Sequence, residues 1–295
     1  MKVPDAKAKS PKPLHSFLDY YHRKTHDIVF CNLSFAKLLL NYFHCFLAFL
    51  SFICNFAPKE FDMTKNIAVV LAGGVGKRLG NSLPKQFLEI AGKMVIEHAV
   101  DAFEQNTHID EIAIVSNALY LSKMEEIVQK NGWKKVKKIL RGGKERYDSS
   151  LSAINAYQEE DVNLVFHDAA RPLVSQRIID DVTEALHHYD AATVAMPSTD
   201  TIIEVDGDFI KDIPDRSRLC RVQTPQAFKI GTIRQAYDIA LKDPDFKVTD
   251  DCGVVKRYLP GTPIFVALGE ESNMKLTYQE DTRLLEMFIQ MRQTT

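Results

Sequence analysis

The chain has 295 residues, 45% of them hydrophobic, which is enough to bury a full core in one large domain or two modest ones. Its 37 basic and 39 acidic residues leave a net charge of -2, which excludes a general electrostatic attraction to nucleic acid or to an anionic membrane. The five cysteines are an odd set without zinc-site spacing, so neither a disulfide framework nor a zinc site is expected. A reducing cytoplasm is the location that this set favours.

The N-terminal residues 1–62 contain an apolar segment, Leu38–Ala57, of about twenty residues without a formal charge. A segment of that length is long enough to anchor the chain in a membrane, although polar residues interrupt it and no small-residue cleavage site follows. In the alternative interpretation the working protein begins at Met63, and the residues before it are an extension outside the catalytic fold. Both interpretations stay open, and the catalytic domain is expected over residues 63–295.

After Lys65, short apolar runs alternate with longer helical patterns. The expected elements are, in chain order, a strand IAVVLA, a helix near Val95–Asn106, a strand EIAIVS, a helix near Leu119–Lys130, a strand KKIL, a helix near Ser149–Tyr157, a strand NLVFHD, a helix near Ser175–His188 and a strand AATVAMP. This βαβα order predicts an α/β fold with a parallel sheet flanked by helices. Right-handed crossovers would put the carboxyl ends of all strands along one edge, where such sheets bind ligands.

One stretch interrupts this alternation. Two short β-prone runs, Thr201–Val205 and Phe209–Ile213, are joined by Asp-Gly-Asp, which is typical of a hairpin turn. We expect the hairpin to project from the sheet as a β-arm over about residues 199–222. Projecting arms often pair with a second subunit, and an unpaired strand edge invites association. A homodimer is therefore expected through the arm.

The most specific motif is LAGGVGKRLG, Leu71–Gly80, which follows the first strand directly and leads into Leu-Pro-Lys-Gln. Its glycines allow backbone N–H groups to approach a triphosphate closely. Positive charge comes from three basic side chains, Lys77, Arg78 and Lys85. The motif is neither G-x-G-x-x-G nor a Walker A sequence, so dinucleotide oxidoreductases and P-loop enzymes are excluded.

A second motif is NLVFHDAARPLV, in which a buried strand ends at Asp168. An aspartate at the carboxyl end of a sheet strand lies where a cation that bridges phosphates is held, so Asp168 is the predicted metal ligand. The alternative role, capping the next helix, is disfavoured because Pro172 intervenes and the helical pattern resumes only near Ser175. His167 is expected to be structural, because attack by an ionised phosphate needs no general base.

Several further polar motifs would each be explained in isolation as a turn or a solvated charge. In chain order they are Gly142–Arg146 with Ser149, Asp200-Thr201, Arg216, Gln223–Gln226, Thr249–Asp251 and Asn273–Lys275. Taken together and in this order, the motifs resemble those of the family of methylerythritol-phosphate and ribitol-phosphate cytidylyltransferases. The resemblance runs from about Asn66 to Met287 and implies a Rossmann-like sheet, a dimer arm, small-molecule substrates with CTP as donor, and Mg²⁺ as cofactor.

The resemblance also implies roles, residue by residue. The catalytic cations around the α-phosphate of CTP would be Arg78, Lys85 and Lys275. The nucleotide would lie along Ala72, Gly73, Gly74 and Gly76, with the cytosine at Gly143 and Ser149 and with the ribose and the metal at Asp168. The polyol phosphate would be held by Thr201 and Arg216 of the arm, the pocket being completed by Thr224 and Thr249, and a supporting residue would be Arg171.

Two positions bear on the acceptor. Methylerythritol-phosphate enzymes commonly have a basic residue just before the Asp-Thr pair and another two residues after the Thr, whereas this chain has Thr199 and Ile203. Those departures resemble the ribitol-phosphate branch, which feeds capsule and cell-wall polymers, while the intact His-Asp-Ala-Ala-Arg-Pro resembles the isoprenoid branch. Ribitol 5-phosphate is the favoured acceptor, and 2-C-methyl-D-erythritol 4-phosphate stays open.

Two other functions are compatible with a glycine-rich turn on such a sheet. A uridylyl- or thymidylyltransferase for hexose 1-phosphates shares a glycine-rich turn, but its usual continuation differs from Leu-Pro-Lys-Gln-Phe. A non-catalytic, membrane-tethered nucleotide sensor on the same fold is disfavoured by the full set of basic residues.

Overall fold

The structure, a computed structural model, describes residues 64–74, 84–157 and 161–293, which all belong to the compact unit Thr64–Thr295. The apolar segment Leu38–Ala57 lies outside the described residues. Among the helices that the structure describes, none combines the length and the apolar character needed to cross a bilayer. The suggested N-terminal anchor therefore stays a prediction.

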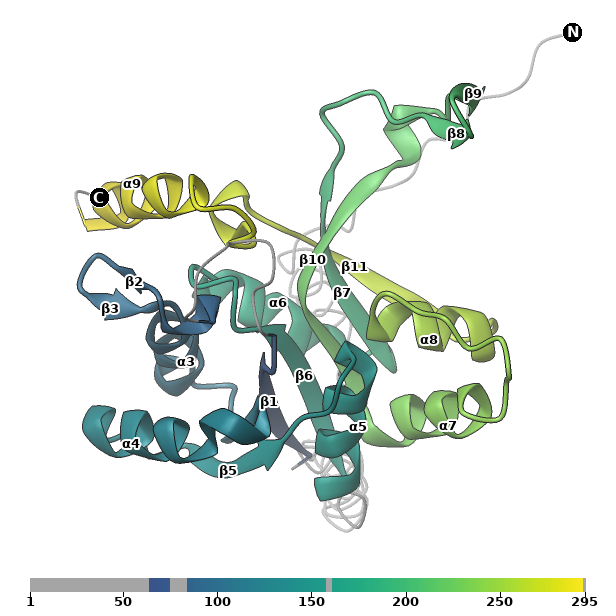
Figure 1. The fold of residues 1–295 in the computed structure, drawn as a ribbon. Helices are drawn as coiled ribbons and strands as arrows, with labels where there is room; N and C mark the ends of the chain where they lie inside the picture. Colours follow the sequence, from purple (N-terminus) through teal and green to yellow (C-terminus); the bar gives the residue numbers. More distant parts are fainter. Residues whose placement is uncertain (1–63, 75–83, 158–160, 294–295) are drawn as a thin grey trace, which may run out of the picture. The chain divides into compact units, whose positions relative to one another are not determined.

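A seven-stranded sheet forms the centre of the described unit, with the strand order β11-β7-β10-β6-β1-β4-β5 (Figure 1). The strands are β1 (Lys65–Ala72), β4 (Glu111–Ser116), β5 (Val136–Arg141), β6 (Val162–Asp168), β7 (Ala191–Pro197), β10 (Cys220–Lys229) and β11 (Ile264–Leu268). Strand β1 pairs in parallel with β4 and β6, as β4 does with β5 and β7 with β11. This arrangement confirms the predicted α/β fold with a mostly parallel sheet.

Strand β10 corrects one expectation. It runs antiparallel between β6 and β7, so its carboxyl end does not join the edge at which the parallel strands end. The physical reason is the path of the chain, which leaves β7, turns in the arm and returns along β7 in the opposite direction. The motif Gln223–Gln226 therefore lies within a ten-residue strand and not in a turn.

Helices cover both faces of the sheet. They are α3 (Val95–Gln105), α4 (Leu121–Asn131), α5 (Arg146–Ala156), α6 (Gln176–Ala185), α7 (Ile230–Ala240), α8 (Asp251–Tyr258) and α9 (Asp281–Gln293). One buried cluster joins Ala68 and Val70 of β1 to residues of α3, α4 and α6, and the other joins Ile67 and Val69 to α5, α7 and α8. Because both faces of β1 are buried, this strand is a continuous apolar run and not an alternating one.

Local side chains fix where the helices begin. The Ser175 hydroxyl accepts the N–H of Ile178 and caps α6, and the Asp250 carboxylate caps α8 in the same way. Helix α5 begins at Arg146, three residues before the predicted start, because the Asp148 carboxylate accepts two backbone N–H groups that precede the helix. That early start matters for the site, because it brings Arg146 to the sheet edge.

The remaining elements are short. A small hairpin is formed by β2 (Glu89–Ile90) and β3 (Lys93–Met94), and single 3-10 turns cover Lys85–Phe87, Ala118–Tyr120, Arg216–Arg218 and Glu271–Asn273. The predicted arm is a hairpin of β8 (Glu204–Asp206) and β9 (Phe209–Asp212), and it projects from the sheet between β7 and β10 (Figure 1). Gly207 in its turn has a φ of +59°, which favours glycine. The hairpin prediction is confirmed.

Candidate active site

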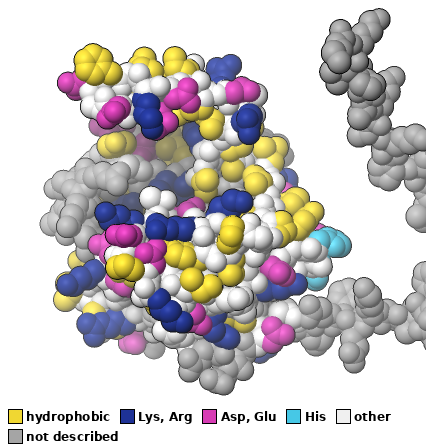
Figure 2. All heavy atoms as spheres, turned by 90° about the vertical axis from the view of Figure 1, so that its right-hand side faces the viewer, with side chains coloured by type: hydrophobic (Ala, Val, Ile, Leu, Met, Phe, Trp, Pro, Cys, Tyr) yellow, Lys and Arg dark blue, Asp and Glu magenta, His cyan; other side chains and the backbone are white. Residues whose placement is uncertain are grey.

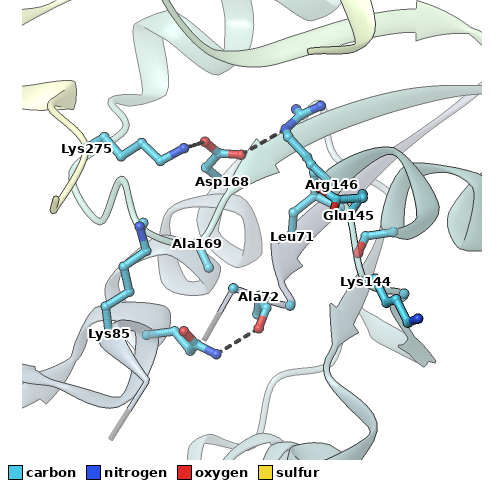
Figure 3. Close-up of a pocket in the computed structure, with 15 residues that line it drawn as sticks. Leu71, Ala72, Lys85, Lys144, Glu145, Arg146, Asp168, Ala169 and Lys275 are labelled. Atoms are coloured by element: carbon cyan, nitrogen blue, oxygen red, sulfur yellow. Dashed lines mark hydrogen bonds and ion pairs between the residues drawn. The ribbon is translucent and has the colours of Figure 1, made fainter. Parts of the chain in front are cut away.

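A cavity of about 190 Å³ lies at the carboxyl ends of β1 and β6 (Figure 3). Its walls come from the end of β1, the 3-10 turn Lys85–Phe87, the start of α5, the end of β6 and the segment before α9. Eight of the predicted site residues line it: Ala72, Gly73, Gly74, Lys85, Gly143, Ser149, Asp168 and Lys275. The sequence therefore predicted a set of distant residues that the fold brings together.

Asp168 lies in the wall of this cavity between two cations, which approach its carboxylate from opposite sides (Figure 3). The Lys275 Nζ is 2.6 Å from Asp168 Oδ2, and the Arg146 Nε is 3.5 Å from Asp168 Oδ1. Burial raises the pKa of the Asp168 carboxyl, but the nearby Arg146 and Lys275 charges lower that pKa more, so the net pKa is well below its usual range. Asp168 is therefore a fixed negative charge in the cavity.

Arg146 is a site residue that the sequence analysis did not assign. Its Nη1 donates to Asp251 Oδ2 at 2.6 Å, and Asp251 is fully buried. Burial lowers the pKa of the Arg146 guanidinium, but the carboxylates of Asp251 and Asp168 raise that pKa more strongly, so the side chain stays charged. The two motifs that supply this pair, Gly142–Arg146 and Thr249–Asp251, were both noted as weak signals. No spacing rule links residues 105 positions apart, so only the fold could connect them.

Lys85, the first residue of the 3-10 turn Lys85–Phe87, also lines the cavity. Its Nζ donates to the carbonyl oxygen of Leu276 at 3.2 Å, and the neighbouring Gln86 Nε2 donates to the carbonyl oxygen of Ala72 at 2.8 Å. The N–H of Leu276 in turn donates to the carbonyl oxygen of Ala170. These contacts tie the Lys-Gln motif to the end of β1 and to the segment that carries Lys275.

Two glycines in the turn before α5 are required by close packing. A Cβ atom on Gly142 would lie 2.7 Å from Ser149 Oγ, and one on Gly143 would lie 2.3 Å from Asp148 Cβ. Gly73 and Gly74 face this turn and, together with Gly143, also line an adjacent cavity of about 660 Å³. Backbone from two separate loops therefore borders both of these adjacent cavities, as in sites that bind nucleotides.

His167 lies behind the cavity and is fully buried. Burial lowers its pKa to about 4, so the ring is neutral at pH 7. Its Nε2 contacts the carbonyl oxygen of Arg171 at 2.9 Å, and its Nδ1 contacts Thr224 Oγ1 at 3.0 Å. The Thr224 hydroxyl also accepts the N–H of Asp168. Both ring nitrogens make contacts within the fold, which agrees with a structural His167.

Thr224 is thus placed beneath Asp168 and not in the cavity wall, although it was predicted to contact substrate. Asn273 Nδ2 donates to the carbonyl oxygen of Thr224 at 2.8 Å, and Arg171 Nη1 donates to the carbonyl oxygen of Asn273 at 2.9 Å. These bonds join the Gln-Thr-Pro-Gln strand to the Asn-x-Lys segment and so position Lys275. The supporting place predicted for Arg171 agrees with these contacts.

Three other predicted substrate residues lie elsewhere in the single chain. Thr249 lines a separate cavity of about 330 Å³, which shares Arg146 with the cavity of Asp168. Thr201 and Arg216 are exposed on the arm and line none of these three cavities, and Arg216 Nη1 donates to the carbonyl oxygen of Thr199. Gly76 and Arg78, also predicted, lie within 75–83, outside the described residues.

Known proteins are similar to this chain over the part that contains the site. Residues 66–291 match the family model described as 2-C-methyl-D-erythritol 4-phosphate cytidylyltransferase. The chain is 44% identical over 229 residues to the 2-C-methyl-D-erythritol 4-phosphate cytidylyltransferase of Thermobifida fusca, a match that covers 75% of this chain and 92% of that protein.

A second relative has a different name. The chain is 44% identical over 235 residues to the bifunctional ribulose 5-phosphate reductase/CDP-ribitol pyrophosphorylase Bcs1 of Haemophilus influenzae, which covers 78% of this chain and 49% of that protein. Among solved structures, the 4-diphosphocytidyl-2C-methyl-D-erythritol synthase of Anaerococcus prevotii has a TM-score of 0.69 at 28% identity, over 77% of this chain and 96% of that one. The chain therefore belongs to the 2-C-methyl-D-erythritol 4-phosphate cytidylyltransferase family and is a nucleotidyltransferase that uses CTP.

Proposed function

We propose that the enzyme transfers the cytidylyl group of CTP to ribitol 5-phosphate and releases pyrophosphate, in the cytoplasm, with residues 63–295 as its catalytic domain. The observation that carries the transfer chemistry is the convergence of Lys85, Asp168 and Lys275 on one cavity bordered by glycine backbone. The choice of ribitol is supported by the neutral residues Thr199 and Ile203 on the arm, and by the similarity to Bcs1.

The proposed reaction is an in-line displacement at the α-phosphorus of CTP. A phosphate oxygen of the acceptor forms the new P–O bond, the bond between the α-phosphorus and the bridging oxygen breaks, and pyrophosphate leaves. Both reactants are anions, so the task of the protein is to align them and to neutralise the charge that gathers at the α-phosphoryl group. The attacking oxygen is already ionised, so no proton has to be removed.

Lys85 and Lys275 are the described cations that we assign to the α-phosphoryl oxygens, with Arg78 as the third. The two lysines line the cavity from separate segments, and both lie on the side of Asp168 that is opposite Arg146 (Figure 3). Backbone N–H groups of Gly73 and Gly74 would bind the triphosphate, and Gly143 with Ser149 would bind the cytosine at the adjoining wall.

Mg²⁺ fits Asp168, which is ionised and lies in the cavity wall. No cluster of three or more acidic, histidine or cysteine side chains suited to a metal occurs in the described ranges, so the other ligands would be substrate phosphate oxygens and water, an arrangement common for Mg²⁺. When bound, the ion withdraws negative charge from the phosphoryl oxygens. Lys275, at 2.6 Å from Asp168 Oδ2, would then exchange that carboxylate oxygen for a phosphate.

The acceptor phosphate would be held by Thr201 and Arg216, with Thr249 nearer the cavity. Since the arm pair lines no cavity of its own chain among those described, we infer that it serves the site of a second subunit in a homodimer. Exposed apolar side chains on the arm support this inference: Ile202, Ile203, Val205, Phe209, Ile210 and Ile213. Figure 2 shows apolar side chains gathered at the top of the molecule, where the arm lies.

The test is a pyrophosphate-release assay with protein begun at Met63, CTP and Mg²⁺. Ribitol 5-phosphate and 2-C-methyl-D-erythritol 4-phosphate are compared as acceptors, and we expect the larger kcat/KM with ribitol 5-phosphate. A larger value with the methylerythritol substrate, for which the Thermobifida fusca relative is named, would overturn the acceptor proposal but not the transfer chemistry. Activity with UTP and a hexose 1-phosphate instead of CTP would overturn both.

A further inference from the structure

Arg146 connects the cavity to the interior of the protein. From the first residue of α5 its guanidinium reaches two carboxylates, with Nε at 3.5 Å from Asp168 Oδ1 and Nη1 at 2.6 Å from Asp251 Oδ2. The Nη2 atom is buried and has no hydrogen-bond partner in the described part of the chain. A planar guanidinium that bridges two carboxylates has a defined orientation, unlike a solvated surface arginine.

Asp251, the inner partner, is itself held from three elements. Its Oδ1 accepts the hydroxyl of Tyr237 on α7 at 2.7 Å, and its N–H, at the start of α8, donates to Gln226 Oε1 on β10 at 3.1 Å. The side chain is fully buried, and a buried carboxylate is tolerated only when it is paired and hydrogen-bonded. The position of Asp251, and with it that of Arg146, is therefore set by the core.

The two cations of Asp168 differ in how they are held. The Lys275 side chain is 41% exposed and ends in an ammonium group on a flexible stem, so it can rotate from a carboxylate to a phosphate. The Arg146 side chain is 25% exposed, and its other end is bound to Asp251. If a triphosphate binds in the cavity, the Lys275 ammonium group can therefore turn toward its phosphate oxygens. Arg146 would stay in place, because it is also bound to Asp251.

We propose that Arg146, held by Asp251, is a positioning residue that fixes the Asp168 carboxylate in the cavity wall while Lys275 turns to the nucleotide. The inference rests on cytidylyl transfer at this site and not on the identity of the acceptor. Asp251, at the start of α8, thereby takes part in the reaction, although Asp251 does not line the cavity of Asp168.

The test uses Arg146→Lys and Asp251→Asn, singly and combined, in the full-length enzyme. Lysine keeps the charge but cannot bridge both carboxylates, and asparagine keeps the shape but loses the charge that holds Arg146. We expect each single variant to lower kcat about 10- to 100-fold, because small misplacements at a reacting centre have effects of that size. The double variant should be little worse than the poorer single one, because both changes break one unit.

Binding of CTP and Mg²⁺ is measured separately by calorimetry, without acceptor. We expect the dissociation constant to change by less than about threefold, because backbone and lysine contacts to the triphosphate remain. A pair that serves only the fold would lower the Tm and leave kcat per folded molecule at the wild-type value, and that result would overturn the proposal. Both acceptors are assayed, so a wrong acceptor assignment appears as the preference of the wild-type enzyme and not as a loss in the variants.

The chain offers a matched control. Arg257, Asp243 and Tyr258 form a similar triad, with Arg257 Nη2 at 2.8 Å and the Tyr258 hydroxyl at 2.6 Å from Asp243 Oδ2, away from the cavity. Asp243→Asn should leave kcat unchanged, and an equal loss there would contradict a specific role for Asp251. Where Asp251→Asn does not fold, Tyr237→Phe removes one bond to Asp251 and is expected to lower kcat about threefold, with unchanged kcat as the contradicting result.

Discussion

The cavity at the strand ends and the β-arm are built in opposite ways. In the cavity, the Asp168 carboxylate and its backbone N–H are held by residues distant in sequence, Arg146, Lys275 and Thr224. On the arm, every residue of β8 and β9 is exposed, and the two strands pair only with each other. An isolated two-stranded hairpin is at best marginally stable in water. One chain therefore orders the cavity around Asp168 by its own contacts, whereas the exposed arm is what the proposed second subunit would cover.

The same contrast separates the two halves of the reaction. Donor binding is proposed to rest on backbone and charge that a single chain preorganises, and preorganised charge is the usual source of a large rate effect. Acceptor binding is proposed to rest on Thr201 and Arg216, whose side chains are exposed in the single chain. Substitutions in the cavity should thus affect turnover, and substitutions on the arm should affect acceptor binding and assembly.

The largest effect is expected from Lys85→Ala. Removal of one cation at the α-phosphoryl group should lower kcat by about 10²- to 10³-fold, in the range seen when a single preorganised donor is lost. The Tm should change little, because the Lys85–Phe87 turn is also held by Gln86, which donates to the carbonyl oxygen of Ala72. Steady-state pyrophosphate release and thermal unfolding of the same preparation check both parts.

Lys229→Ala is the matched control. Lys229, the last residue of β10 and so at the end of that strand away from the arm, forms a surface ion pair with Asp190, and such pairs contribute about 0–1 kcal/mol. Its removal should leave kcat and KM for CTP unchanged. Near-normal turnover in Lys85→Ala, or a comparable loss in Lys229→Ala, would contradict the central place of the cavity lysine.

Much of the cavity could be predicted from sequence because its residues follow strands whose ends the topology brings together. Asp168 ends β6 and Gly73 follows β1, and these strands are neighbours in the sheet. Apolar runs set the strands, and the βαβ order then sets the shared edge. The boundaries of β7 were predicted to the residue, because the run AATVAMP is bounded by polar residues on both sides.

The parts that were missed depend on contacts that no local pattern encodes. Arg146 and Asp251 meet only after α5 and α8 pack on the same face of the sheet. The strand character of Gln223–Gln226 was hidden because a Thr-Pro pair inside a run usually indicates a turn. The contacts of the Thr224 hydroxyl with His167 and with the N–H of Asp168 also join separate strands, so no local pattern indicates them.

The next largest effect, after that of Lys85→Ala, is expected in how the free energy of unfolding changes with pH. The pKa of His167 is lowered to about 4 in the fold, below the ordinary value of 6.5, so between these values the unfolded chain binds a proton that the folded chain does not. The stability contributed by the neutral ring is present above about pH 6.5 and is lost as pH falls toward about 4, by at most about 3 kcal/mol. Urea unfolding of the wild type at a series of pH values measures this loss.

His167→Gln isolates the contribution of the ring. The variant should be less stable than the wild type at pH 7, and the difference should shrink as pH falls from about 6.5 to about 4, because only the wild type has the histidine to protonate. A constant difference over that window would show that the ring keeps an ordinary pKa in the fold.

A smaller effect is expected from Arg216→Ala on the arm. Loss of one charged contact to the acceptor phosphate should raise the KM for the acceptor about tenfold, because a hydrogen bond to a charged group contributes about 1.5–3 kcal/mol. KM for CTP and the Tm should stay at their wild-type values, since Arg216 is exposed and its described bond is to the backbone of Thr199. A higher KM for CTP, with an unchanged KM for the acceptor, would instead show that Arg216 binds CTP and not the acceptor.

The double variant Phe209→Ser and Ile210→Ser is expected to have the smallest effect on the stability of the single chain. It nevertheless tests directly whether the arm forms a dimer. The side chains of Phe209 and Ile210 are 79% and 60% exposed, so in a single chain their loss should change the free energy of unfolding by less than about 0.5 kcal/mol for each residue. If these side chains are buried by a second subunit, sedimentation should show a dimer for the wild type and a monomer for the variant.

The same double variant tests the acceptor site. Because the proposed acceptor site of the monomer lacks the partner's arm, the rate of transfer should fall as dimerisation is lost, while CTP binding persists. A monomeric variant with full turnover would place the acceptor site within one chain, and the arm would need another function.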